Sequence, residues 1–213
     1  LSRSGASANY ALDLSLRDAL LRQGPRQVPL DRLQVAGDWT PSHLLLHDIQ
    51  LDSPLLAWRG SGGIATTGTG RYHVDGKGRI HLARLRDVQP VLPVELSGDV
   101  GVTLLLAGEG GAPPLISGTL QGREVFVNRQ RIRSLFAKLS MSGPDYSCDD
   151  LNLEVDPDGT LTGRVTVSVA EKKVRFSAQM MDFALAVFRT GRFFEHPLDG
   201  LVEGTVEGEI PFS

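Results

Sequence analysis

The chain has 213 residues, with 22 Lys and Arg against 25 Asp and Glu, a formal net charge of -3. This balance argues against general nucleic-acid binding, which uses a basic surface to contact phosphates. The single Cys148 excludes a disulfide within the chain and a cysteine-rich zinc site. No apolar run approaches the roughly 18 residues of a membrane-spanning helix. Because the chain begins at Leu1 without Met, we expect a piece of a longer protein.

Alternation of apolar and polar residues is the commonest local pattern. It first appears at Tyr10, Leu12, Leu14 and Leu16. Alternation with a period of two gives a strand one apolar face and one solvent-exposed face, so each run predicts a strand. The later runs cover residues 100–106, 151–155, 164–169 and 174–180.

Turn residues separate these runs. Asp-Gly-Lys-Gly at 75–78, Asp-Pro-Asp-Gly at 156–159 and Ala-Glu-Lys-Lys at 170–173 are typical of hairpin connections. Short strands at hairpin spacing predict an antiparallel all-β fold. We expect at most one or two short helices within it.

Two segments have a spacing that suits a helix. Ile132, Leu135, Phe136 and Leu139 are spaced as on one helical face, and Asn128 could cap it. We favour a short helix or an irregular cap there, against a strand that would use alternate residues from Leu135 to Met141. A fainter helical pattern covers residues 16–20.

Glycine recurs at the centre of a five-residue motif, apolar-x-Gly-x-apolar. In a strand all three defining positions share one face, so these glycines would lie among the apolar side chains. Such placement favours a sheet that curls around its own apolar face. Glycines that fill tight spots in an ordinary sandwich core are the alternative. The central glycines are Gly37, Gly98, Gly118, Gly163 and Gly204.

The order of these elements resembles a known family. The run at 96–108, a Gly/Pro link and the run at 114–120 are similar to a repeat unit of TamB-type members of the AsmA-like superfamily. The segment at 202–211 resembles a stretch of the related YdbH-type envelope proteins. The similarity is clearest over residues 95–130 and 150–211.

This resemblance implies a β-taco-like open groove with an apolar lining, and no catalytic residue, metal or cofactor. It implies a periplasmic segment of a protein anchored in the inner membrane, which bridges the two membranes of a Gram-negative envelope and carries phospholipid. Outer-membrane proteins are a further class of partner. We expect one repeat-built domain over residues 1–213, with a weak boundary near 90–94. Exposed sheet edges could also pair into a dimer.

Alternation assigns the candidate lining residues to one face of their strands. A groove lining for acyl chains and an ordinary core are both compatible with this parity. The candidates are Val100, Val102, Leu104, Leu106, Val165, Val167, Val169, Val174 and Phe176. A basic run at Arg129, Arg131 and Arg133 could contact lipid phosphates at the groove rim, or form a solvated face.

Other candidate sites favour structural roles. His43 and His47 lie in a strand-like segment, where four residues span about 13 Å, too far for one metal ion. Asp156-x-Asp158-Gly159 departs from a calcium loop at its later ligand positions, so a turn is favoured. The glycine-rich segment at 60–70 lacks the ending of a phosphate-binding loop. We therefore expect a non-enzyme, with a structural or interaction module for outer-membrane protein assembly or an envelope complex as the alternative to lipid carriage.

Overall fold

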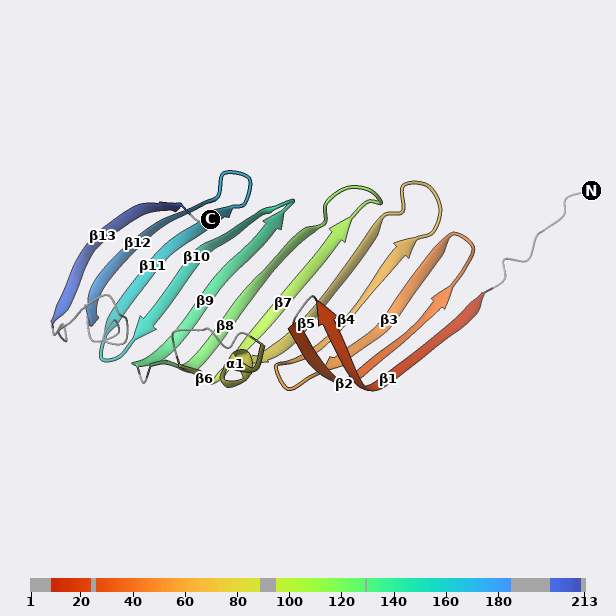
Figure 1. The fold of residues 1–213 in the computed structure, drawn as a ribbon, viewed down its shortest axis with the longest axis horizontal. Coiled ribbons are helices and arrows are strands. Elements are labelled where there is room, and N and C mark those ends of the chain that lie inside the picture. Colours follow the sequence, from red (N-terminus) through yellow and green to blue (C-terminus); the bar gives the residue numbers. More distant parts are fainter. Residues whose placement is uncertain (1–8, 24–25, 89–94, 129, 185–199, 212–213) are drawn as a thin grey trace, which may run out of the picture.

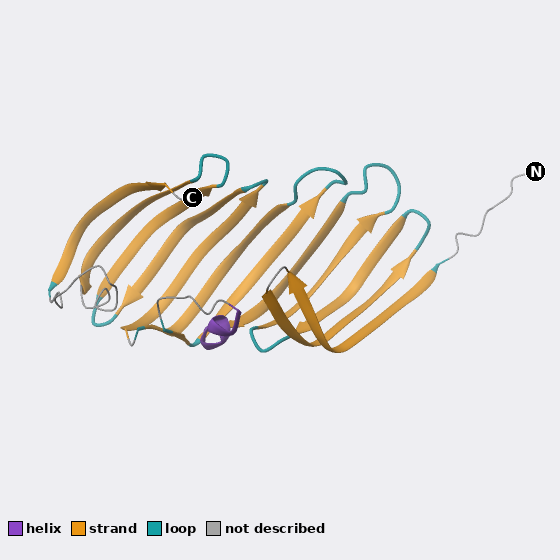
Figure 2. Cartoon of the chain, viewed as in Figure 1, coloured by secondary structure: helices purple, strands orange, loops and turns teal. Residues whose placement is uncertain are grey.

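The computed structural model describes residues 9–23, 26–88, 95–128, 130–184 and 200–211. Within these residues one sheet of thirteen strands forms nearly the whole molecule (Figures 1 and 2). The strands are β1 Tyr10–Gln23, β2 Arg26–Trp39, β3 His43–Asp52, β4 Leu56–Ala65, β5 Tyr72–His81, β6 Leu96–Ser97, β7 Asp99–Gly108, β8 Leu115–Val127, β9 Gln130–Ser142, β10 Asp145–Val155, β11 Gly159–Ser168, β12 Lys173–Ala184 and β13 Leu201–Pro211. The all-β prediction is confirmed.

The strands follow one another as an antiparallel meander. Twelve of them pair in chain order, and only the short β6 lies off this path, where it pairs with β8. Between β5 and β7 the chain forms a 3-10 turn, η1 Leu82–Arg84, and a short helix, α1 Leu85–Val88. The sheet continues across this point because β5 pairs directly with β7. The boundary expected near 90–94 lies outside the described residues.

Alternation gives this sheet one apolar face, which we call the apolar face throughout. Residues directly opposite each other in paired strands point to the same side of a sheet, so a row can be followed from strand to strand. One row crosses all twelve strands of the path and consists only of apolar residues and glycine. It runs Leu14, Val35, Ile49, Gly60, Gly76, Leu104, Gly118, Leu139, Cys148, Val165, Phe176 and Gly208.

The opposite face is polar along the neighbouring row. It presents Ser15, Gln34, Gln50, Arg59, Lys77, Thr103, Thr119, Lys138 and Asp149. Hydrogen bonds between neighbouring strands support this face, for example between the hydroxyls of Thr103 and Thr119 at 2.6 Å. The sheet therefore has one face suited to water and one suited to apolar contact over its whole length.

Strand pairing is irregular along one margin of the sheet, which we call the bulged rim. Asp18, Glu124 and Asp182 adopt positive φ values of 51, 55 and 48° at interruptions of the pairing in β1, β8 and β12. Between the partners of Ser97 and Val100, β8 carries one residue more than the strands β6 and β7, and between Met180 and Phe183, β12 carries one residue more than β13. Each of these two extra residues shifts the alternation by one, which returns Val125 and Phe183 to the apolar side, whereas the register of β1 with β2 is the same on both sides of Asp18. Two small dry cores form at this rim, one around Val100, Val125 and Ile132 and the other around Val155, Met180 and Phe183.

Two local predictions are wrong, and both segments are strands. Residues 132–139 belong to β9, and residues 75–78, predicted as a turn, lie inside β5. In β9 the alternate residues from Leu135 to Met141 continue the apolar face, so pairing on both sides outweighs the helical spacing. In β5 the glycines face Trp58 across the strand pair and are used for close packing.

The remaining local predictions divide between strand and turn. Residues 16–20, with their faint helical pattern, belong to β1. The connections after Val155 and after Ser168 are turns, as predicted. The short helical segment lies instead at residues 82–88.

Candidate functional site

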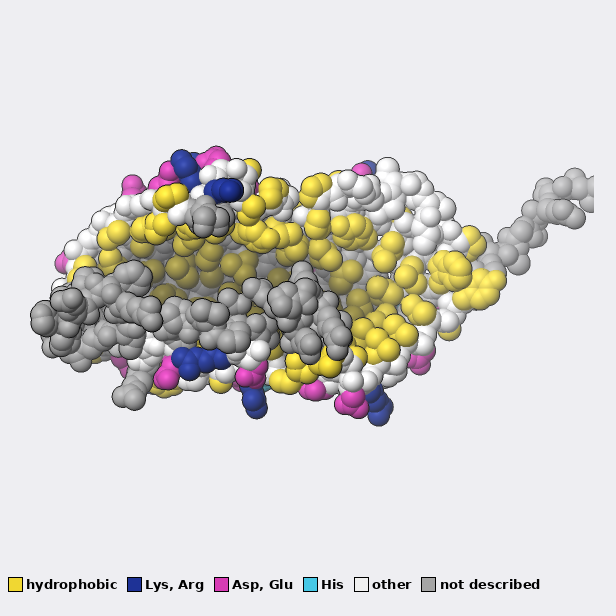
Figure 3. Space-filling model, in the orientation of Figure 1, with side chains coloured by type: hydrophobic (Ala, Val, Ile, Leu, Met, Phe, Trp, Pro, Cys, Tyr) yellow, Lys and Arg dark blue, Asp and Glu magenta, His cyan; other side chains and the backbone are white. Residues whose placement is uncertain are grey.

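The apolar face is hollowed along the sheet. Figure 3 shows hydrophobic side chains gathered in this hollow, with charged residues around it. We call the hollow the groove. Twelve strands at about 4.8 Å spacing give it a length of roughly 50 Å. The open curled sheet expected from the alternation and the glycine motif is thus the architecture of the molecule.

Six of the predicted lining residues lie half-buried on the groove floor. They lie in two rows that cross the sheet, in which the Cys148 thiol and the Tyr146 hydroxyl are the only polar side-chain groups. Half-burial means that each keeps surface free for contact with another molecule. The six are Leu104, Leu106, Val165, Val167, Val174 and Phe176.

Three other predicted residues have different roles. Val100 and Val102 are only 3% and 5% exposed, and Leu82 packs against the cluster around Val100. They are core residues at the bulged rim, and the groove floor begins beyond them. Val169 lies past the end of β11 and is 44% exposed in the turn that leads to β12. The alternation of apolar and polar residues cannot distinguish buried from half-buried side chains on one face. Their burial depends on the bulges and on the 82–88 segment, which the alternation does not indicate.

The groove glycines allow neighbouring strands to approach closely. A Cβ on Gly37 would lie 2.2 Å from the Leu45 carbonyl oxygen, and one on Gly118 would lie 2.2 Å from that of Thr103. Real side chains cannot occupy such positions without moving the backbone. Gly163 meets the Ser177 carbonyl oxygen in the same way, at 2.5 Å. These contacts support the role expected for the glycines, which is to let the sheet curl.

The two other predicted glycines differ from this pattern. Gly204 shares the apolar face as the partner of Met180, but it lies in the edge strand β13 with no atom near its would-be Cβ. Gly98 lies between β6 and β7 with a φ of 99° and is exposed. It lies at the bend between these strands, and its carbonyl oxygen accepts a hydrogen bond from the Leu82 amide at 3.0 Å.

Sequence reasoning missed two aromatic residues of the floor, Trp58 and Tyr72. The Trp58 ring covers Gly60, Gly76 and Gly78, and the Tyr72 ring covers Gly108. The run Trp58-x-Gly60-x-Gly62 carried the signal for the first, since its members share one strand face. The match with Gly76 and Gly78 needs the register between β4 and β5, which only the structure provides.

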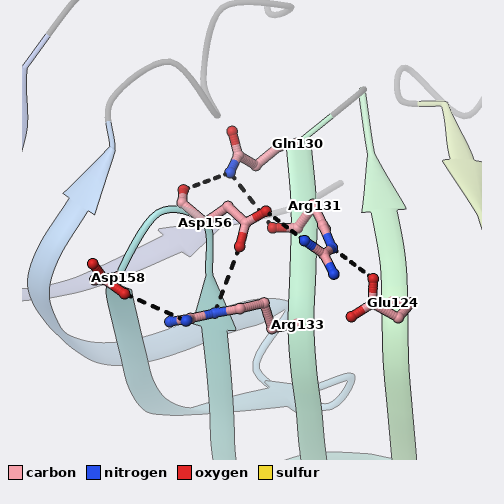
Figure 4. A network of polar contacts seen from close by, with 6 residues as sticks. All are labelled: Glu124, Gln130, Arg131, Arg133, Asp156 and Asp158. Carbon is pink, nitrogen blue, oxygen red and sulfur yellow. Dashed lines mark hydrogen bonds and ion pairs between the residues drawn. The ribbon is translucent and has the colours of Figure 1, made fainter.

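The candidate headgroup arginines lie in an ion-pair network where β8, β9 and the β10–β11 turn meet (Figure 4). Arg131 donates to Glu124 over 2.5 Å and approaches Asp156 within 3.3 Å. Arg133 lies 3.4 Å from Asp158 and 3.6 Å from Asp156. Three carboxylates therefore neutralise two guanidinium groups, which leaves little positive charge for a phosphate. Arg129 lies outside the described residues.

The electrostatics of this network are those of exposed pairs. A hydrogen bond from Arg131 lowers the pKa of Glu124, and the same contact raises the pKa of Arg131. The Gln130 side chain donates to the Asp156 carbonyl oxygen at 2.8 Å, which ties the turn to β9. These contacts connect β8, β9 and the end of β10 at the bulged rim.

Groups that could carry chemistry are dispersed over the described part of the chain. No three His, Cys, Asp or Glu residues there lie together as metal ligands would. His47 and His81 each contact one carboxylate, of Asp38 at 2.7 Å and of Asp99 at 2.8 Å. Cys148 lies on the groove floor, where burial and the charge of Asp149 raise the pKa of its thiol.

A second hollow, of about 750 Å³, lies on the polar face beside the bulge in β10. Its lining combines Phe136 with polar side chains that include Asn152, Thr162 and Gln179. Its two carboxylates already have partners, since Asp150 pairs with Lys138 at 2.5 Å and Asp149 accepts a hydrogen bond from the Ser147 hydroxyl at 2.8 Å. The apolar groove is the stronger candidate for a functional surface.

Among the residues that the structure describes, neither helical segment has the length and hydropathy needed to cross a bilayer. Comparisons with protein-family models, with curated proteins and with solved structures each gave no match.

Proposed function

We propose that this chain is a segment of an AsmA/TamB-like periplasmic bridge, whose apolar β groove carries phospholipid between the inner and outer membranes. The observation that carries the proposal is the row of apolar residues and glycines that crosses twelve strands on the concave face. A monomeric soluble protein rarely exposes so extended an apolar surface without a use for it. The resemblance of residues 95–130 and 150–211 to AsmA-like repeats supports the same function.

The physical requirement of lipid carriage matches the groove. An acyl chain loses about 0.8 kcal/mol for each CH₂ exposed to water, so a path across an aqueous gap must stay apolar without interruption. The half-buried floor from Leu104 to Phe176 offers contact to such a chain. A polar headgroup would remain at the open mouth of the groove in water, where it needs no dedicated site. Inner-membrane anchoring and periplasmic location belong to this proposal.

The experiment is to extract the purified protein with organic solvent and to identify bound lipid by mass spectrometry. The test variant carries Val167→Asp and Phe176→Asp, which place two charges on the floor. The control variant carries Thr166→Asp and Gln179→Asp, on the polar face of the same two strands. Circular dichroism establishes that all three proteins are folded.

We expect phospholipid in the parent and the control, and none in the floor variant. A parent protein that is free of lipid and also fails to take up labelled phospholipid from vesicles contradicts the proposal. Equal lipid in all three proteins would show that the lipid binds elsewhere, because a buried charge on the floor cannot be tolerated by an acyl chain.

The open margins of the sheet favour a second candidate. In the described chain β1 and β13 each pair on one side only, and Leu14 and Leu16 of β1 are 44% exposed. An edge strand can add an extended peptide by main-chain hydrogen bonds. This would make the chain an interaction module for outer-membrane protein assembly. Binding of extended outer-membrane-protein peptides by a lipid-free protein would favour this candidate.

A further inference from the structure

Three aromatic rings on the groove floor each lie over a glycine of the next strand. In each case the glycine is the direct cross-strand partner of the aromatic residue. The pairs are Trp58 with Gly78, Tyr72 with Gly108, and Phe176 with Gly208. A Cβ built on Gly208 would lie 2.5 Å from Cζ of Phe176, and one on Gly108 would lie 2.5 Å from the Tyr72 hydroxyl oxygen. The rings therefore occupy the space that a side chain on the neighbouring strand would fill.

This arrangement controls the height of the floor. Side chains on one face of a sheet stand roughly perpendicular to it. An aromatic ring in this position would rise above valine and leucine neighbours and would divide the groove. A glycine opposite lets the ring lean across the next strand and lie low. In β5 the space left by glycine is larger, because the Trp58 indole extends over both Gly76 and Gly78.

We propose that these cross-strand glycines are recesses that hold the aromatic rings down, so that an acyl chain can contact the floor continuously across β4–β5, β5–β7 and β12–β13. This inference rests on the proposed function and adds to it the residues that keep the path clear. Phe176 is the central case, because it lies in the row that contains Leu104, Cys148 and Val165 in the middle of the floor.

Gly208 offers the cleanest test of a recess. The three atoms nearest to its would-be Cβ all belong to the Phe176 ring, so a methyl group there displaces the ring alone. Gly78 is unsuitable, since its would-be Cβ lies 2.6 Å from the Ala57 carbonyl oxygen. Gly101 provides a matched control on the polar face, where a Cβ would make an ordinary contact of 3.4 Å with the Gln121 carbonyl oxygen.

The experiment uses vesicles of phosphatidylethanolamine and phosphatidylglycerol doped with a phospholipid that carries a diazirine on its acyl chain. After photolysis, mass spectrometry maps the crosslinked residues on β11 and β13. The proteins compared are the parent, Gly208→Ala, Gly101→Ala and the double variant Gly208→Ala with Phe176→Leu. If Gly208→Ala fails to fold, Gly108→Ala serves as a second recess variant, because the three atoms nearest to its would-be Cβ all belong to Tyr72; its crosslinks are then compared on β5 and β7.

We expect Gly208→Ala to lower crosslinking on β13 relative to β11 by roughly tenfold, the factor that corresponds to about 1.4 kcal/mol. Gly101→Ala should keep the parental ratio, and removal of the ring in the double variant should restore it. An unchanged ratio in Gly208→Ala, or no rescue in the double variant, overturns the recess inference while lipid carriage stands. Absence of crosslinks on every strand of the parent overturns the proposed function and the inference together.

Discussion

Gly118 shows what the curled floor demands of a single residue. A side chain there would meet the carbonyl oxygen of Thr103 at 2.2 Å, and the Leu104 side chain at 2.9 Å. Since the first of these atoms belongs to the backbone, the strand pair itself would have to open. The apolar-x-Gly-x-apolar motif in the sequence thus marks a position where β7 and β8 come together more closely than side chains permit.

We predict that Gly118→Ala lowers the free energy of unfolding by about 1–3 kcal/mol, as overpacking does in a close-packed interior. Urea denaturation followed by circular dichroism measures the change. The matched substitution Gly101→Ala lies on the polar face, where its methyl has room, and should change stability by less than about 0.5 kcal/mol. Equal effects of the two substitutions would show that the floor is not tightly curled at Gly118.

The reactivity of the Cys148 thiol tests whether the groove floor is shielded from water. Cys148 lies between Leu139 and Val165 in the central row, and burial and Asp149 raise the pKa of its thiol. Because the thiolate is the reactive form, we predict that iodoacetamide modifies it more slowly at neutral pH than it modifies free cysteine, with a rate that rises toward alkaline pH. Phospholipid vesicles should slow the modification further. Rapid alkylation at neutral pH, unaffected by lipid, would place the thiol in water.

At the scale of the element, the bulged rim joins strands through side chains as well as backbone. Glu124 lies in the segment where β8 carries one residue more than β6 and β7, and it accepts a hydrogen bond from Arg131 of β9, which lowers the pKa of its carboxyl below the ordinary value of 4.5. The unfolded chain therefore binds the proton more readily than the folded one. This contact stabilises the fold above pH 4.5, and the stabilisation is lost as the pH falls through the lowered pKa.

We predict that Glu124→Gln reduces the dependence of unfolding free energy on pH below about 4.5, where the carboxyl titrates. Because the pair is exposed, the effect is small and weakens with salt. Urea midpoints measured between pH 3 and pH 7, at low and high salt, provide the comparison. A pH dependence identical to that of the parent would mean that Glu124 and Arg131 are not paired in solution.

The elements themselves were predicted unevenly from the sequence. Turns that contain Asp156-Pro157-Asp158-Gly159 could be found, because proline and the turn residues act locally. The strand at β9 was missed because Leu135 and Leu139 satisfy both a helical and an alternating pattern, and the choice depends on β8 and β10. Gly76 and Gly78 suit a turn when the sequence is considered alone. Their place inside a strand follows from Trp58 on the neighbouring strand, whose side chain fills the space beside both glycines.

At the scale of the whole molecule, the amphipathic meander has no second layer over most of its apolar side among the residues that the structure describes. Alternation predicted the apolar side of each strand, and the glycine motif predicted the curl. Neither pattern could predict which apolar side chains are covered by other parts of the chain. Val102 is 5% exposed, whereas Leu104, two residues later on the same face, is half-buried. The headgroup role expected for Arg131 and Arg133 depended on free charge, and the carboxylates of a distant turn neutralise it.

We propose that the concave apolar face is the surface that receives acyl chains. Both tryptophans of the chain lie on this face, Trp39 opposite Leu44 in one row and Trp58 opposite Leu51 in another. Bromine on an acyl chain quenches indole fluorescence on contact. The measurement is therefore to titrate the protein with vesicles of brominated and of ordinary phosphatidylglycerol, using the parent and Trp39→Phe, in which only Trp58 reports.

We expect brominated lipid to quench both proteins while ordinary lipid does not, and Val167→Asp with Phe176→Asp to weaken the quenching. Fluorescence that is the same with brominated and ordinary lipid, in a folded protein, would contradict this expectation and would leave the apolar face without an acyl-chain role.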